Sequence, residues 1–171
     1  YSDDFPRARY LLEPLKTLQK NASSAFKGAS AVVTSWSRDH SRAVVEVSYL
    51  DHPSQDFLFE PAKKSMTVIG SAYPKLDGLA LPRRLKFDYP ASDGIEIRGY
   101  LTTPVGDARG PRPLIVLPHG GPELRDTMSF DWWAAYYAAN GYLVYQPNFR
   151  GSFGYGEAFR NAGDGQWGRQ M

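Results

Sequence analysis

The residues best suited to chemistry in this chain are a glycine pair within the run Pro-His-Gly-Gly-Pro at 118–122. A continuous apolar run at 114–117 comes directly before it and is typical of a strand buried on both faces of a parallel sheet. Glycines let the backbone approach a substrate closely. A backbone N–H fixed there would stabilise the charge that acyl transfer builds on a carbonyl oxygen, and losing such a donor costs roughly 3 kcal/mol. The alternative is a plain glycine turn between a strand and a helix.

The elements after the glycine pair alternate between helix and strand. Ser129 or Asp131 would begin a helix that Gly141 would end. This alternation predicts parallel strands joined by right-handed crossovers. The predicted elements are a helix at 130–140, a strand at 142–147 and a short helix at 157–162. Two aromatic pairs on the first helix would lie in the core or in a patch that the rest of a domain covers; these are Trp132, Trp133, Tyr136 and Tyr137.

The N-terminal half is patterned as short strands and turns. A helix at 14–21 precedes them, and residues 71–82, with two Pro and one Gly, form a passage between domains. A second hairpin follows this passage, with a tight turn at Asp93-Gly94. Short, evenly spaced strands indicate a sandwich, a barrel or a propeller blade. The predicted strands are 31–37 and 42–49, which form a hairpin, then 56–60 and 64–70, and later 85–89 and 95–101.

Composition excludes several classes of function. The 171 residues suffice for one ordinary domain or pieces of two, and the net charge is +2 without a basic run, so nucleic acid is not an expected partner. There is no Cys, which excludes disulfides and thiolate metal sites and leaves the compartment, cytoplasmic or periplasmic, open. The longest apolar stretch is far too short to span a membrane. His40 and His52 lack ligand-like neighbours, so no metal site is expected.

Three further motifs make a family resemblance specific. His-Gly-Gly-Pro at 119–122 is followed by Ala-Asn-Gly-Tyr-x-Val at 139–144 and by Pro-Asn-Phe-Arg-Gly-Ser-x-Gly-Tyr-Gly at 147–156. Together they resemble the prolyl oligopeptidase family, above all its acylaminoacyl-peptidase and dipeptidyl-peptidase-like branch. The resemblance begins near residue 93 and is strong over 114–156. Upstream, residues 35–40 resemble the Trp-Ser-x-Asp-Gly turn of the family's propeller blades, with His40 in place of Gly.

The resemblance implies a mixed fold and a serine peptidase. Residues 1–75 would end a β-propeller, 76–84 would be the interdomain passage, and 85–171 would begin an α/β-hydrolase domain. The complete protein would cleave short peptides with a Ser-Asp-His triad, through an acyl-enzyme, without a metal or organic cofactor. All three triad residues are expected beyond Met171, so this chain would be an inactive fragment.

The resemblance also assigns the site residues. Gly121 would donate its N–H to the oxyanion, with Gly120 as the second choice, and the other donor would follow the nucleophile. His119 cannot be the triad base, because the order in this fold is Ser, Asp, His; it is expected to fix the loop by hydrogen bonding. Ser152 lacks the Gly-x-Ser-x-Gly context of a nucleophile. Arg150 is expected to tie its loop to neighbouring backbone or carboxylates, or else to be solvated.

Two other readings remain. One is a carboxylesterase or lipase with the same loop, and the other is a non-catalytic propeller scaffold with a degenerate hydrolase domain. The expected partner of the whole protein is a short peptide substrate, with no nucleic acid and no membrane. The fragment would expose sheet edges and helix faces, so its stability would require the rest of the domain, a partner chain or an oligomeric form.

Overall fold

The computed structural model describes residues 4–106 and 110–171, which form two compact units. The N-terminal unit is Phe5–Leu79, and the C-terminal unit joins Ala80–Met171 with Asp4. The division between Leu79 and Ala80 lies within the stretch 76–84 that the sequence marks as an interdomain passage.

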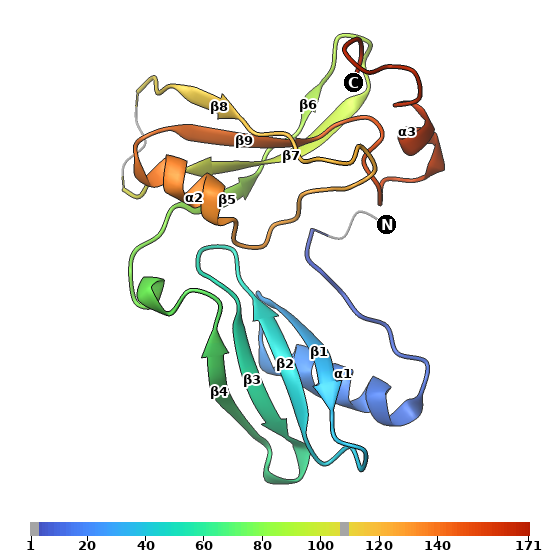
Figure 1. The fold of residues 1–171 in the computed structure, drawn as a ribbon, viewed down its shortest axis with the longest axis vertical. Coiled ribbons are helices and arrows are strands. Elements are labelled where there is room, and N and C mark those ends of the chain that lie inside the picture. The colour runs from blue at the N-terminus through green and yellow to red at the C-terminus, as the bar shows by residue number, and fades with distance from the viewer. Residues whose placement is uncertain (1–3, 107–109) are drawn as a thin grey trace. The chain divides into compact units, whose positions relative to one another are not determined.

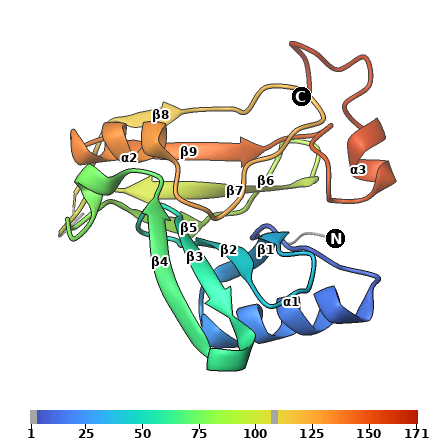
Figure 2. The same ribbon diagram turned by 60° about the horizontal axis from the view of Figure 1, so that its bottom comes forward.

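The N-terminal unit is one four-stranded antiparallel sheet with a helix on one face. The strands follow each other in the order β1-β2-β3-β4 (Figure 1), which confirms the predicted hairpin and the two strands after it. Helix α1 runs along the sheet beside β1 (Figure 2). The elements are α1 (Glu13–Ala25), β1 (Ser30–Trp36), β2 (Ala43–Ser48), β3 (Gln55–Glu60) and β4 (Ser65–Ser71), with short 3-10 turns at Pro61–Lys63 and Pro74–Leu76.

The core of this unit follows from the sequence periodicity of the sheet and of the helix. Alternate residues of the strands point to the same face, and α1 contributes apolar side chains spaced three and four residues apart. Burying each large apolar side chain stabilises the unit by roughly 1.5–3 kcal/mol. The buried set is Leu15, Leu18 and Ala22 from α1 with Ala31, Val33, Ala43, Val45, Val47, Phe57 and Phe59 from the sheet.

Helix α1 also protects the edge of the sheet. The Gln19 side chain donates to the Ala31 carbonyl at 2.7 Å and accepts from the Val33 N–H at 3.0 Å. Strand β1 is an edge strand, and unpaired edge groups invite pairing with another chain. Because Gln19 occupies these groups, α1 is held to the sheet by polar contacts as well as apolar ones. The helix runs from Glu13 to Ala25 and is longer than the predicted 14–21.

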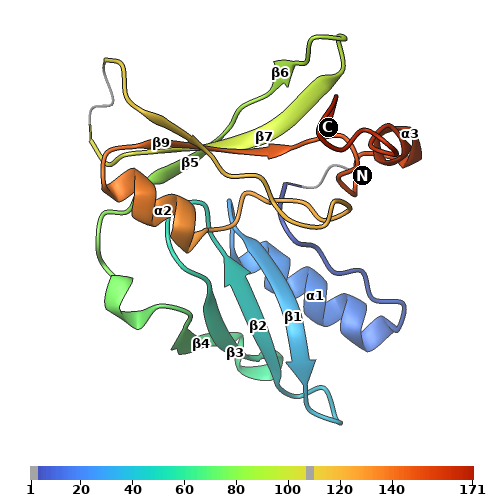
Figure 3. The ribbon, with the colours of Figure 1, turned by 45° about the horizontal axis from the view of Figure 1, so that its top comes forward.

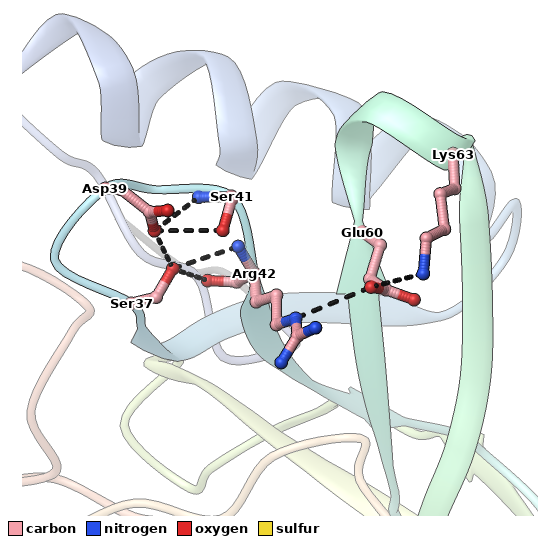
Figure 4. A network of polar contacts seen from close by, with 6 residues as sticks. All are labelled: Ser37, Asp39, Ser41, Arg42, Glu60 and Lys63. Atoms are coloured by element: carbon pink, nitrogen blue, oxygen red, sulfur yellow. Dashed lines mark hydrogen bonds and ion pairs between the residues drawn. The ribbon is translucent and has the colours of Figure 1, made fainter.

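The turn between β1 and β2 is held by one carboxylate (Figure 4). The Ser37 hydroxyl donates to Asp39 at 2.7 Å, and the Ser41 N–H and hydroxyl donate to the same oxygen at 3.1 and 2.9 Å. These hydrogen bonds, led by that of Ser37, lower the pKa of Asp39 to about 2. His40 adopts φ 58°, so it takes the left-handed conformation that the family motif gives to Gly.

The C-terminal unit is a mixed sheet. Strand β7 pairs antiparallel with β5, β6 and β9, whereas β8 pairs parallel with β9. The parallel pair confirms the crossover that the alternation of strand and helix predicted. Helix α2 lies beside β9 (Figure 3). The elements are β5 (Arg83–Lys86), β6 (Tyr89–Pro90), β7 (Glu96–Thr103), β8 (Leu114–Val116), α2 (Trp132–Ala139), β9 (Leu143–Asn148) and α3 (Glu157–Asn161).

The prediction that the strand at 114–117 is buried on both faces is wrong for the described chain. Leu114 and Val116 are 55% and 56% exposed, whereas Ile115 and Leu117 pack against the buried residues of α2 and β9. Strand β8 is at the edge of the sheet order β5-β7-β9-β8, and α2 covers only one of its faces. The apolar run therefore leaves two large side chains on an uncovered face.

Helix α2 begins and ends where the sequence indicates. Asp131 is its N-cap and accepts from the Ala134 N–H at 2.9 Å, which satisfies one of the unpaired donors of the first turn. Gly141 takes φ 94° just after its end. Of the aromatic residues, Tyr137 packs against the core, whereas Trp132, Trp133 and Tyr136 are exposed. Among the described residues, neither this helix nor any other is long and apolar enough to cross a membrane.

Candidate active site

The glycine loop begins where β8 ends. Leu117 extends the pairing by one residue, because its N–H donates to the Tyr145 carbonyl of β9 at 2.8 Å. Parallel strands end at the same edge of a sheet, and in open α/β sheets ligands bind outside the carboxyl ends of the strands. The loop after β8 and the loop after β9 therefore lie together at the edge where a substrate would be expected.

Gly121 occupies a backbone position that only glycine fits. Its φ is 132°, in a region that other residues avoid. A Cβ atom there would lie 2.7 Å from the Leu124 nitrogen and 2.8 Å from the Glu123 nitrogen, and both are backbone atoms that cannot move aside cheaply. A Cβ on Gly120 would meet no atom within 4 Å. The position of Gly121 thus requires a residue without a side chain, whereas that of Gly120 does not.

The Gly121 backbone is accessible. Gly120 and Gly121 are both exposed, and within residues 4–106 and 110–171 the Gly121 N–H has no backbone acceptor. A backbone N–H without a backbone acceptor, in an exposed loop at the carboxyl end of a parallel strand, is suited to bind a developing oxyanion.

His119 connects this loop to the loop after β9. Its Nδ1 lies 2.8 Å from the Gly120 carbonyl oxygen, and its Nε2 lies 2.8 Å from the Ser152 hydroxyl. The ring also stacks on Phe149, with centroids 4.4 Å apart and 17° between planes. Both ring nitrogens and one ring face are occupied within the protein, which is the arrangement expected of a residue that fixes the loop.

His119 and Ser152 have the residue types of a nucleophilic dyad, but the serine is not accessible to a substrate. Ser152 is 0% exposed, and its N–H donates to the Phe149 carbonyl at 2.9 Å in a tight turn. A hydroxyl enclosed in this way does not reach a substrate carbonyl. The contact spans 33 positions of sequence, and only the parallel pairing of β8 with β9 brings its two ends together.

Arg150 is buried and paired, which confirms the prediction that it ties its loop to a carboxylate and to backbone. Its side chain is 5% exposed and donates to the Asp93 carboxylate and to the Gln170 carbonyl. The turn at Asp93-Gly94, the loop after β9 and the end of the chain are thereby joined. The solvated alternative is wrong.

Asn148, which the sequence analysis did not single out, holds the segment that links the glycine loop to α2. It is fully buried at the end of β9. Its Oδ1 accepts from the Asp126 N–H at 2.8 Å, and its Nδ2 donates to the Asp126 carbonyl at 3.1 Å and to the Tyr155 hydroxyl at 2.6 Å. Burial disfavours the charged form of each ionisable group near this segment. It therefore raises the pKa of the Asp126 carboxyl group and lowers the pKa of the Arg84 guanidinium. The signal in the sequence was a polar Asn at the end of a mostly apolar strand.

A cavity of about 580 Å³ lies between the glycine loop, the loop after β9 and helix α3. Its volume is in the range of small-molecule sites, roughly 300–1,000 Å³. It is lined by Glu123, Phe153, Gly154, Gly156, Glu157 and Arg160. In the part of the chain that the structure describes, no group of three or more His, Asp or Glu residues is arranged to hold a metal ion.

Comparisons with known proteins identify the family. Residues 128–171 match the model of the prolyl oligopeptidase family. The dipeptidyl peptidase family member 6 of Caenorhabditis elegans is 34% identical over 160 residues, which cover 81% of this chain and 22% of that protein. The chain belongs to the prolyl oligopeptidase family.

Two further proteins extend this family relationship. The dipeptidyl aminopeptidase BIII of Pseudoxanthomonas mexicana is 34% identical over 135 residues, covering 75% of this chain and 20% of that protein. A solved puromycin-hydrolysing peptidase of Mycobacterium tuberculosis superposes with a TM-score of 0.63 at 25% identity, covering 76% of this chain and 21% of its own. The chain thus spans about a fifth of the length of the relatives that it matches.

Proposed function

We propose that this chain is part of a serine peptidase that hydrolyses short peptides through an acyl-enzyme. The observation that carries the proposal is the exposed residue Gly121, held at φ 132° in the loop after a parallel strand, whose N–H has no backbone acceptor among the described residues. The family membership of the chain and the peptidase names of its relatives support it. In the proposed reaction a serine oxygen adds to the peptide carbonyl, the carbonyl oxygen becomes the oxyanion, and Gly121 donates to it.

The domain organisation is part of the same proposal. The four-stranded antiparallel sheet of the N-terminal unit has the size of one propeller blade, so residues 1–75 would close a β-propeller. Residues 85–171 would begin an α/β-hydrolase domain whose triad lies beyond Met171. The exposed Leu114 and Val116 on one face of β8 would then be covered by the rest of that domain.

The test uses the complete protein that contains this chain. A fluorophosphonate probe should label one serine, and dipeptidyl and acylaminoacyl nitroanilides should be cleaved, with residues 1–171 alone as the inactive control. Puromycin belongs in the substrate panel because one solved relative is described as hydrolysing it. Hydrolysis of short-chain esters without any amide cleavage would favour a carboxylesterase or lipase. Absence of both labelling and hydrolysis would favour the scaffold and refute the proposal.

A further inference from the structure

The carbonyl that His119 contacts belongs to the same peptide unit as the proposed oxyanion donor. The Gly120 C=O and the Gly121 N–H lie in one planar group with opposite directions. The His119 Nδ1 is 2.8 Å from that carbonyl oxygen. Whatever fixes the carbonyl therefore also fixes the direction of the N–H.

We propose that Ser152 and His119 form a hydrogen-bond relay that orients and polarises the Gly120–Gly121 peptide for oxyanion binding. Ser152 is then a positioning residue that acts through His119. The inference rests on the proposed peptidase function and adds to it a specific role for a buried serine.

The chemistry of the acceptors sets the position of each hydrogen. A carbonyl oxygen only accepts, so the contact at Gly120 requires the hydrogen of the neutral imidazole on Nδ1. The lone pair is then on Nε2, and the Ser152 hydroxyl donates to it at 2.8 Å. Ser152 thus selects the one neutral tautomer of His119 that can donate to the peptide.

Two residues that follow β9, Ser152 and Phe149, hold the His119 ring. Ser152 is 0% exposed and fixed by its own N–H bond to Phe149 at 2.9 Å. Phe149 in turn stacks on the His119 ring at 4.4 Å. The loop after one parallel strand thereby determines the geometry of the loop after its neighbour.

The relay acts on the strength of the donor as well as on its direction. A hydrogen bond to a peptide carbonyl polarises the N–H of the same peptide, by roughly 10–30% in bond strength. Oxyanion charge develops only in the transition state, so a stronger, fixed donor raises kcat and leaves substrate binding unchanged.

The test compares three variants of the complete protein with a serine control. His119→Asn places its amide nitrogen near the position of Nδ1 and keeps a donor to Gly120, whereas His119→Gln reaches toward Ser152 and loses that donor. We expect kcat to fall about 100-fold in His119→Gln and about tenfold in His119→Asn and Ser152→Ala, with KM within about twofold. The exposed Ser24→Ala should leave both constants unchanged. A His119→Asn variant that is as slow as His119→Gln would overturn the relay.

A second measurement does not depend on activity. Crystal structures of the wild-type and Ser152→Ala proteins should show the Nδ1 to Gly120 oxygen distance lengthen beyond about 3.5 Å in the variant. If the wild type proves inactive but this distance lengthens, the relay stands and the peptidase proposal fails. If the wild type is an active peptidase and Ser152→Ala changes neither kcat nor the distance, the relay is wrong.

Discussion

Replacing each of the two glycines with alanine tests the oxyanion assignment within one loop. Gly121→Ala puts a methyl group 2.7 and 2.8 Å from two backbone nitrogens, at a φ of 132°. The conformational cost alone is roughly 1–3 kcal/mol, and the collision forces the loop to shift. Gly120→Ala meets no atom within 4 Å, so its effect on stability should stay within about 0.5 kcal/mol.

The expected kinetic difference follows from the role of the N–H. If the Gly121 donor is displaced from the oxyanion, kcat should fall by about 10²–10³ with little change in KM. Gly120→Ala should retain kcat within about threefold, because neither its Cβ nor its φ disturbs the peptide.

The assay is steady-state hydrolysis of a dipeptidyl nitroanilide by the complete protein, with thermal unfolding of each variant as a check on folding. Equal losses of kcat in the two variants would count against Gly121 as the specific donor, because of the two glycines only Gly121 has a conformational requirement. An unchanged kcat in a folded Gly121→Ala protein would refute it as well.

Three further predictions concern the stability of the two units. Val45→Ala, at a fully buried core position, should lower the free energy of unfolding of the N-terminal unit by about 2–3 kcal/mol in chemical denaturation. By NMR titration the Asp39 carboxyl group should have a pKa of about 2, and this pKa should rise toward its ordinary value of 3.8 in Ser37→Ala. The ionised, hydrogen-bonded carboxylate should thus stabilise the unit above pH 3.8, and this stabilisation should be lost as the pH falls through 2. An unchanged pKa in Ser37→Ala would contradict the assigned cause. Asp93→Asn should lower the unfolding free energy of the C-terminal unit by about 2–3 kcal/mol, because it leaves the nearly buried Arg150 without its carboxylate. A denaturation midpoint equal to that of the wild type would show that the ion pair does not stabilise the fold.

Local pattern predicted most of the elements. The hairpins and the helix start near Ser129 or Asp131 follow from periodicity, turn residues and helix signals within short windows. These features are decided by neighbours in the sequence, so the sequence alone reveals them. Helix α1 was predicted too short because its last turn contains Ser23 and Ser24, which favour caps and turns.

The contacts that the sequence could not predict join distant segments. The bond between His119 and Ser152 and the anchoring of Asp126 by Asn148 depend on which strands are neighbours in the sheet. The exposure of Leu114 has the same origin, because an apolar run indicates burial but does not specify which layers cover it. Such features depend on tertiary packing rather than on periodicity.

A crystal structure of the complete protein after reaction with a peptidyl phosphonate would show directly whether Gly121 binds the oxyanion. The phosphonyl oxygen stands in for the oxyanion of the tetrahedral intermediate. We predict that it lies about 2.7–3.1 Å from the Gly121 nitrogen, within hydrogen-bonding distance. A phosphonyl oxygen bound to other donors, with the Gly121 N–H pointing away from it, would exclude Gly121 as the oxyanion donor.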